Sequence, residues 1–348
     1  VDNVAAPAPA VELQGAGGDD VYNKAEIGSD NSVTAKVTLT AGTQVGDLLV
    51  VTNGAGGELF RGEVTAEMLK DGLTVEVPVV GTPDEIKVTA QVTDQAGNPS
   101  ALAEDKAGVD NVAAPAPIVE LQGAGDDNTY NKDEIGSDNS VTGKVTLADG
   151  TQVGDLLVVT NGAGGELFRG EVTAEMLKDG LTVEVPVAEG QGSVKVTAQV
   201  TDIAGNPSGI ADDTAKVDNV TAPAPTVELQ GAGDDNTYNK DEIGSDGKVT
   251  GKVTLADGTQ VGDLLVVTNG AGGELFRGEV TAEMLKDGLT VEVPVAEGQG
   301  SVKVTAQVTD IAGNPSGIAE DTAKVDNVAA PAPTVELQGA GGDDVYNK

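Results

Sequence analysis

The stretch SVTAKVTL, residues 32–39, decides the fold class. Its apolar side chains occupy every second position from Val33 to Leu39, and threonine or lysine fills the positions between them. Successive side chains of a β-strand point to opposite faces of a sheet, so a period of two predicts a half-buried strand. The same alternation returns over residues 73–79 and 86–93. These stretches indicate an all-β protein.

Turn residues separate further short apolar runs on both sides of these stretches. Residues 66–72, AEMLKDG, are too short for a stable helix, so we expect one helical turn that ends at Gly72. Pro78 lies on the outward face of its run, which suggests an edge strand or a bulge. Seven short strands with turns between them predict a seven-stranded immunoglobulin-like β-sandwich. We expect the strands at residues 8–13, 32–39, 47–52, 58–65, 73–79, 86–93 and about 101–109.

The motif VDNVAAPAP begins at Val1 and returns at Val109, at Val217 with Thr221 in place of its first alanine, and at Val325. The copies start 108 residues apart, and a repeat of that length is long enough to bury a core of its own. Alternating prolines make each motif extended and stiff. We therefore expect tandem domains arranged end to end as a monomeric rod. The predicted boundaries are 1–108 (repeat 1), 109–216 (repeat 2), 217–324 (repeat 3) and 325–348, the linker and first strand of a truncated fourth repeat.

The composition is strongly acidic, with a formal net charge of -37 from 57 acidic and 20 basic residues. This charge excludes nucleic acid as a natural partner and repels an anionic membrane surface, but it attracts multivalent cations. The chain has no Cys, His or Trp, so zinc, copper and haem lose their usual ligands. No apolar run is long enough to span a membrane, so we expect no direct membrane insertion.

The order of the strands predicts which loops lie at which end of a sandwich. The loop after the first strand of one repeat then faces the loop before the last strand of the next repeat, across the linker. Carboxylate, amide and backbone oxygens gathered there, with no basic residue among them, are typical of a Ca²⁺ site. The alternative is a set of solvated acids with no specific ion. For the first joint the candidate ligands are Asp19, Asp20, Asp110, Asn111, Asp202 and Asn206, and for the second they are Asp126, Asp127, Asp218, Asn219, Asp310 and Asn314.

A second calcium site inside one loop is a further hypothesis. Asp133, Glu134 and Asp138 follow the first strand of repeat 2 closely. Their spacing is not that of an EF-hand, because DDNTYNKDE has no glycine at the sixth position.

Three motifs together resemble the bacterial Ig-like extender repeats of giant RTX-type, type I-secreted adhesins, such as biofilm or marine ice-binding adhesins. They are the turn VTD-x-AGN-P-S at residues 92–100, the VDN…AP linker, and the VGD of residues 45–47. The resemblance implies Ca²⁺-rigidified sandwiches at an extracellular bacterial cell surface, acting as a spacer that carries a distal binding domain. It also implies that the linker and turn acids are metal ligands: Asp2, Asp94, Asp110, Asp202, Asp218 and Asp310.

Two other function classes compete with the spacer. An enzyme is disfavoured, because nothing in the sequence builds a cleft with two carboxylates across it and an active site repeated in every domain is improbable. The alternative function is a glycan- or cell-binding adhesion module. Binding faces usually carry exposed aromatic residues, but each repeat has one Phe and one Tyr, and we expect both to be buried.

Overall fold

The computed structural model describes residues 2–336, and its elements confirm the all-β prediction. By compactness the chain divides into two units. Unit 1 comprises Val1–Gly123, Ser140–Val187 and Ser193–Ala215, and unit 2 comprises Ala124–Asn139, Ala188–Gly192 and Lys216–Lys348. The predicted domain boundaries remain predictions beside this division. Half of the fourth segment, residues 337–348, lies outside the described residues, and residues 328–336 have no strand.

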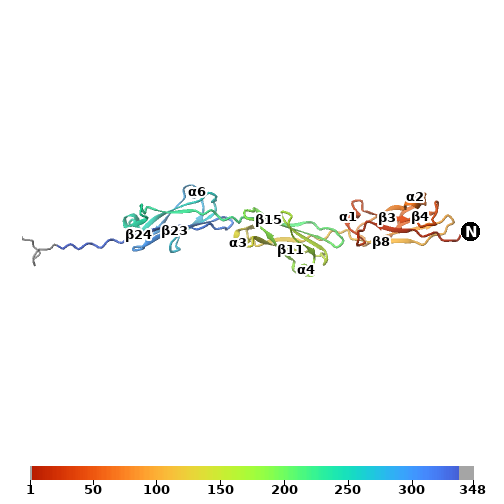
Figure 1. Cartoon of the computed structure of the whole chain (residues 1–348), viewed down its shortest axis with the longest axis horizontal. Coiled ribbons are helices and arrows are strands. Elements are labelled where there is room, and N and C mark those ends of the chain that lie inside the picture. Colours follow the sequence, from red (N-terminus) through yellow and green to blue (C-terminus); the bar gives the residue numbers. More distant parts are fainter. Residues whose placement is uncertain (1, 337–348) are drawn as a thin grey trace, which may run out of the picture. The chain divides into compact units, whose positions relative to one another are not determined.

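Repeat 1 shows the architecture in full and lies in unit 1 (Figure 1). All seven predicted strands are present, and a two-residue strand, β2, is added. Two short helices complete the repeat: α2 at the predicted helical turn, and α1 where we expected only a loop. The elements are β1 (Ala10–Gln14), β2 (Val21–Tyr22), α1 (Lys24–Ile27), β3 (Ser32–Thr38), β4 (Leu48–Asn53), β5 (Glu58–Glu63), α2 (Ala66–Asp71), β6 (Leu73–Pro78), β7 (Glu85–Thr93) and β8 (Ala103–Val109).

These strands form an antiparallel three-stranded sheet, β1-β3-β6, and a five-stranded sheet, β2-β8-β7-β4-β5. Only β2 pairs in parallel, with Tyr22 opposite Val109. Pro78 ends β6, which pairs with β3 alone, so the edge-strand prediction is confirmed. The inward side chains of both sheets meet in one core that contains Tyr22, Leu49 and the linker residue Ala6. Two sheets packed around one core make an immunoglobulin-like β-sandwich.

Repeat 2 follows the same order of elements, and its three-stranded sheet is β14-β11-β9. The parallel pair is again short, with Tyr130 opposite Val217. Its elements are β9 (Ile118–Gln122), β10 (Thr129–Tyr130), α3 (Lys132–Ile135), β11 (Ser140–Thr146), β12 (Leu156–Asn161), β13 (Glu166–Glu171), α4 (Ala174–Asp179), β14 (Leu181–Pro186), β15 (Ser193–Thr201) and β16 (Ala211–Val217).

Repeat 3 has the sheets β17-β19-β22 and β18-β24-β23-β20-β21. Its core includes Tyr238, Leu265 and the linker residue Ala222. Each linker therefore contributes an alanine to the core of the sandwich that follows it. The elements are β17 (Thr226–Gln230), β18 (Thr237–Asn239), α5 (Lys240–Ile243), β19 (Lys248–Thr254), β20 (Leu264–Asn269), β21 (Glu274–Glu279), α6 (Ala282–Asp287), β22 (Leu289–Pro294), β23 (Ser301–Thr309) and β24 (Ala319–Asp326).

Candidate functional site

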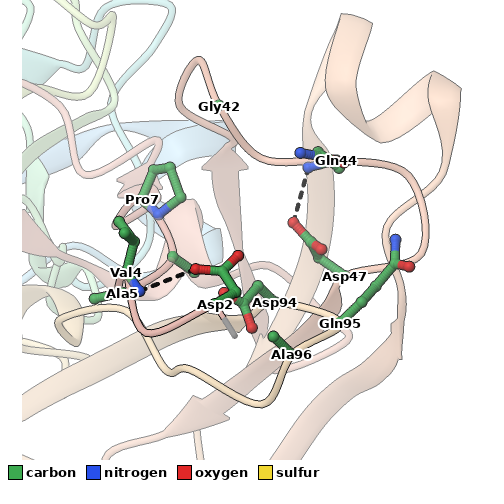
Figure 2. Close-up of a pocket in the computed structure, with 11 residues that line it drawn as sticks. Asp2, Val4, Ala5, Pro7, Gly42, Gln44, Asp47, Asp94, Gln95 and Ala96 are labelled. Carbon is green, nitrogen blue, oxygen red and sulfur yellow. Dashed lines mark hydrogen bonds between the residues drawn. The ribbon is translucent and has the colours of Figure 1, made fainter.

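An acidic pocket lies at the N-terminal end of repeat 1 (Figure 2). Its volume is about 370 Å³, and three carboxylates line it: Asp2 from the linker, Asp47 from the loop before β4, and Asp94 from the turn after β7. The loops come together here because β3 and β7 end at the same pole as the chain enters. The predicted position of the loop before the last strand, beside the linker, is confirmed.

Each of the three carboxylates accepts a backbone hydrogen bond from its own loop. Asp2 Oδ1 accepts from the Val4 N–H at 3.0 Å, and Asp47 Oδ2 accepts from the Gln44 N–H at 2.8 Å. Asp94 Oδ1 accepts from the Asn98 N–H at 2.8 Å. These bonds hold the acids in place at the rim of the pocket without neutralising them.

The electrostatics of this pocket favour a cation. No basic residue lines it. The side-chain amide of Asn98, followed by its backbone N–H, donates hydrogen bonds that lower the pKa of Asp94 below its ordinary value. Asp47 is only 4% exposed, although it carries an acid group. A buried carboxylate without a cationic partner is costly, so this position suits a bound positive ion.

The same three positions recur at both joints. Asp155 and Asp263 take the place of Asp47, and each is 3% exposed with a backbone N–H donor at 2.7 Å, from Gln152 and Gln260 respectively. Asp47, Asp155 and Asp263 were not among the predicted ligands. The VGD motif contains Asp47 and was available as a signal, but it was used only to establish the resemblance.

The first joint brings three of its six predicted residues, Asp110, Asp202 and Asn206, into one hydrogen-bond network, within unit 1. Asn206 is its centre. The side-chain nitrogen of Asn206 donates to the Asp110 carbonyl at 2.8 Å and to Asp202 Oδ2 at 3.1 Å, and its Oδ1 accepts from the Lys24 N–H at 2.8 Å. Asn111 lies on the other side of the linker, where its Nδ2 donates to the Gly81 carbonyl at 3.0 Å.

The second joint repeats this network within unit 2. Asn314 Nδ2 donates to the Asp218 carbonyl at 2.8 Å and to Asp310 Oδ2 at 3.0 Å, while its Oδ1 accepts from the Lys132 N–H at 2.8 Å. Asn219 is held twice by the preceding loop, because it accepts from the Gly190 N–H at 2.8 Å and donates to the Ala188 carbonyl at 3.1 Å.

The remaining predicted ligands sit on exposed loop surface. Asp19 Oδ1 accepts from the Val21 N–H at 3.2 Å, and Asp20 turns the chain with a φ of 60°. In the second loop the position of Asp19 is taken by Asp127, whose Oδ1 accepts from the Thr129 N–H at 2.9 Å. Asn128, with a φ of 56°, replaces Asp20, and Asp126 aligns with Gly18. The two loops therefore offer different acid pairs.

Glu134, one of the three acids of the hypothetical second site in repeat 2, has a structural role. Glu134 accepts from the Asn131 N–H at 3.0 Å, and Asn131 accepts from the N–H groups of Asp133 and Glu134. This is a capping box at the start of α3.

Within residues 2–336, no three Asp or Glu side chains lie together as a metal-binding group. The pocket offers only oxygen donors, which is the right chemistry for Ca²⁺. Binding requires Asp2 of the linker and Asp94 of the turn to move toward Asp47, the acid before β4. No helix among the described residues is long and apolar enough to cross a membrane.

Comparisons with known proteins give structural likeness only. No protein-family model and no curated protein matches the chain. A Ca²⁺-stabilised adhesin that helps an Antarctic bacterium reach out and bind ice is 22% identical, over 98% of this chain and 79% of that chain, with a TM-score of 0.49. A 1.5-MDa bacterial ice-binding adhesin, in a structure that concerns host cell surface retention, is 20% identical over 93% and 100%, with a TM-score of 0.41.

A tetra-tandem repeat from the extending region of a large adhesion protein is 19% identical, over 92% of this chain and 74% of that chain, with a TM-score of 0.28. Because all three TM-scores are below 0.5, the fold of this chain is assigned from its own strands and sheets.

Proposed function

We propose that this chain is a non-enzymatic, monomeric spacer of a bacterial cell-surface adhesin, made of tandem sandwiches with Ca²⁺ at their linkers. It holds a distal binding domain away from the cell. The observation that carries this proposal is the anchoring of each linker to both of its neighbours.

The linker at the first joint, residues 109–117, leaves few residues free to bend. On the preceding side, the Asp110 N–H donates to the Tyr22 carbonyl at 3.0 Å, and Asn111 is bonded to Gly81. On the following side, the Ala114 N–H reaches the Asn206 carbonyl at 3.5 Å, and Ala114 is buried. Val112 and Ala113 alone lie between these anchors, and Pro115 follows. A linker this short and this restricted favours stiffness.

Calcium fits the chemistry of the same region. Asp110, Asp155 and Asp202 at the first joint and Asp218, Asp263 and Asp310 at the second correspond to the three acids of the pocket in Figure 2. Bound Ca²⁺ supplies the positive charge that offsets their mutual repulsion. At a free ion concentration about 100 times the Kd, each such site adds roughly 2.7 kcal/mol to the stability of the folded state.

The competing function, a glycan- or cell-binding module, lacks its usual anchors. Tyr22, Tyr130 and Tyr238 are almost fully buried in their cores, and Phe60 is only partly exposed against its core. Interfaces that bind partners tightly concentrate their energy in exposed aromatic and arginine side chains, and the one arginine of each repeat is already paired with a glutamate of its own strand. The described residues therefore favour the spacer.

Small-angle scattering, calorimetry and thermal melting of the full chain, with Ca²⁺ and with a chelator, test this proposal. We expect the melting temperature to rise when Ca²⁺ is added. We expect the maximum dimension of the particle to equal the length of three sandwiches placed end to end. A melting temperature and binding heat indifferent to Ca²⁺ would remove the metal from the proposal. A compact particle in both conditions would remove the spacer itself.

Site variants locate the metal. Asp110→Ala with Asp202→Ala, or Asp155→Asn alone, should abolish one calorimetric binding event and loosen the first joint only. Glu184→Gln is the matched control, because this exposed acid lies within β14, opposite Thr142, and not in a loop at either end of the sandwich. Equal loosening of both joints, or an equal effect of the control, would contradict the assignment.

A further inference from the structure

We propose that Asn206 and Asn314 are direct recognition residues between successive repeats, and that their contact works without metal. Each forms an asparagine socket with the acid and the glycine of its turn: Asp202, Gly205 and Asn206 in repeat 2, and Asp310, Gly313 and Asn314 in repeat 3. The occupant of a socket is the start of the first short helix of another copy of the repeat. This goes beyond the proposed function, because it needs no calcium.

The socket satisfies a donor that the preceding repeat cannot satisfy itself. At the start of α1, Asn23 Oδ1 accepts from the N–H groups of Ala25 and Glu26, at 2.9 and 3.0 Å. The N–H of Lys24 has no acceptor within that helix, since the first N–H groups of any helix lack one. Asn206 Oδ1 accepts this N–H from the next repeat at 2.8 Å.

All hydrogen-bond partners of the Asn206 side-chain amide are consistent with one orientation of that amide. Its oxygen faces a backbone donor, and its nitrogen faces two acceptors, the Asp110 carbonyl and the Asp202 carboxylate. One side chain therefore joins the preceding helix, the linker and its own turn. With its oxygen bonded to Lys24 and its nitrogen to two acceptors, Asn206 acts here as a protein–protein contact.

The glycine of the socket lets the two repeats approach closely. A Cβ placed on Gly205 would lie 3.1 Å from Asn23 Nδ2, and one on Gly313 would lie 3.3 Å from Asn131 Nδ2. The equivalent glycine of repeat 1, Gly97, has a similar φ of 92° but no atom within 4 Å of such a Cβ. The close approach at this glycine is therefore made by the preceding repeat and is not a property of the turn itself.

Repeat 1 shows the same socket open. Asn98 keeps its bonds to Asp94, from N at 2.8 Å and from Nδ2 at 2.9 Å, yet it is partly exposed. Asn206 and Asn314 are 2% and 1% exposed. The chain therefore offers an internal comparison, because the corresponding turn of repeat 1 contacts no helix start among the described residues. At the other end, no asparagine side chain among the described residues reaches the N–H of Lys240.

Amide hydrogen exchange of the full, segmentally labelled chain in chelator tests the proposal. We expect the amides of Lys24 and Lys132 to exchange roughly tenfold more slowly than that of Lys240, because each is held by a buried acceptor. Asn206→Ala should raise the exchange rate of Lys24 toward that of Lys240 and leave Lys132 unchanged. Asn98→Ala is the matched control and should change none of the three.

Two results would overturn the proposal. One is equal exchange of Lys24 and Lys240 in chelator, or protection of Lys24 that appears only when Ca²⁺ is added. The other is an equal effect of Asn206→Ala and Asn98→Ala on Lys24. If Asn206→Ala disturbs the fold of repeat 2, Gly205→Ala compared with Gly97→Ala gives an independent answer, since both share the backbone cost and only Gly205 meets a neighbour. Equal consequences of these two would also refute it.

Discussion

At the scale of single residues, Tyr22 shows how a core poor in aromatic side chains is organised. The side chain is fully buried, and its hydroxyl donates to the Gln14 carbonyl at 2.7 Å. Burial, with smaller contributions from Asp105, Asp20 and Glu26, raises the pKa of Tyr22 to about 12. The phenol therefore ties the end of β1 to the core in its neutral form only.

Tyr22→Phe should destabilise repeat 1 by about 1 kcal/mol, because the buried Gln14 carbonyl loses its donor. The raised pKa adds a sign: the unfolded phenol ionises near pH 10, so the stability from this residue is present below that pH and is lost as the pH rises toward 12. Urea unfolding at pH 8 and pH 11 measures both effects. Absorbance titration gives the control, since the variant should lose a late-ionising tyrosine. Loss of one that titrates near pH 10 would contradict the assignment.

The sequence predicted that this tyrosine is buried, but not what it bonds. Burial follows from scarcity, because an aromatic side chain in a Val- and Ala-rich repeat is the best available filler for a core. Its partner is a carbonyl eight residues away at the end of β1, across a loop without periodicity. No local pattern encodes that distance.

At the scale of elements, helix α2 is fixed at both ends by local chemistry. Thr65 accepts from the Met68 N–H at 3.2 Å, and the N–H of Gly72 donates to the Met68 carbonyl at 3.0 Å. Gly72 has a φ of 81°, and a Cβ there would lie 2.7 Å from the Val37 carbonyl. The helix therefore ends at this glycine because β3 passes directly beneath it.

Gly72→Ala should destabilise repeat 1 by roughly 2–3 kcal/mol, from the backbone strain and the collision with β3 together. Gly56→Ala is the matched control, because Gly56 has a φ of 79° and nothing within 4 Å of the added Cβ. The control should cost only about 1 kcal/mol. Thermal unfolding of both variants measures the difference, and equal losses would show that the contact with Val37 has no effect.

The elements that the sequence predicted and those that it missed differ in one physical respect. β3, β6 and β7 have one buried face each, so alternation reports them. β2, which pairs in parallel with β8, has only two residues, and two residues are too few for any period to appear. Helix α1 is also short, but Asn23 and Glu26 form its capping box, and that signal was present in the sequence.

At the scale of the whole molecule, strand order alone placed the right loops at each linker. It could not give the depth of each acid, so the exposed pair Asp19 and Asp20 was predicted as ligands while the buried Asp47 was left out. Burial depends on how loops fold over one another, which alternation does not report. The hydrogen bond from the Lys24 N–H to Asn206 was also not predicted, because it forms between repeats and depends on how their loops fold.

The two joints also differ in a way that predicts different stiffness. Asn219 and Asn327 each accept from the N–H of a loop glycine, Gly190 and Gly298, at 2.8 and 2.9 Å. In repeat 1 the loop reads VGTPD over residues 80–84, where the others read AEGQG, and Thr82 replaces that glycine. The positive-φ glycine of this loop is Gly81, one position earlier than Gly190 in the alignment, so the loop takes a different course, and Asn111 Oδ1 is buried without a hydrogen-bond partner among the described residues. A buried acceptor left unpaired costs about 1–3 kcal/mol.

Replacing residues 80–84 of repeat 1 with AEGQG should therefore stiffen the first joint. The new glycine N–H supplies the donor that Asn111 Oδ1 lacks, while Glu85 and its ion pair with Lys106 remain. We expect the Asp110 amide, which donates to Tyr22, to exchange several-fold more slowly, in line with a gain of about 1 kcal/mol. The converse change in repeat 2, residues 188–192 to VGTPD, is the control and should loosen only the second joint. Unchanged exchange at Asp110 would mean that the unpaired oxygen has no influence on how firmly the first linker is held.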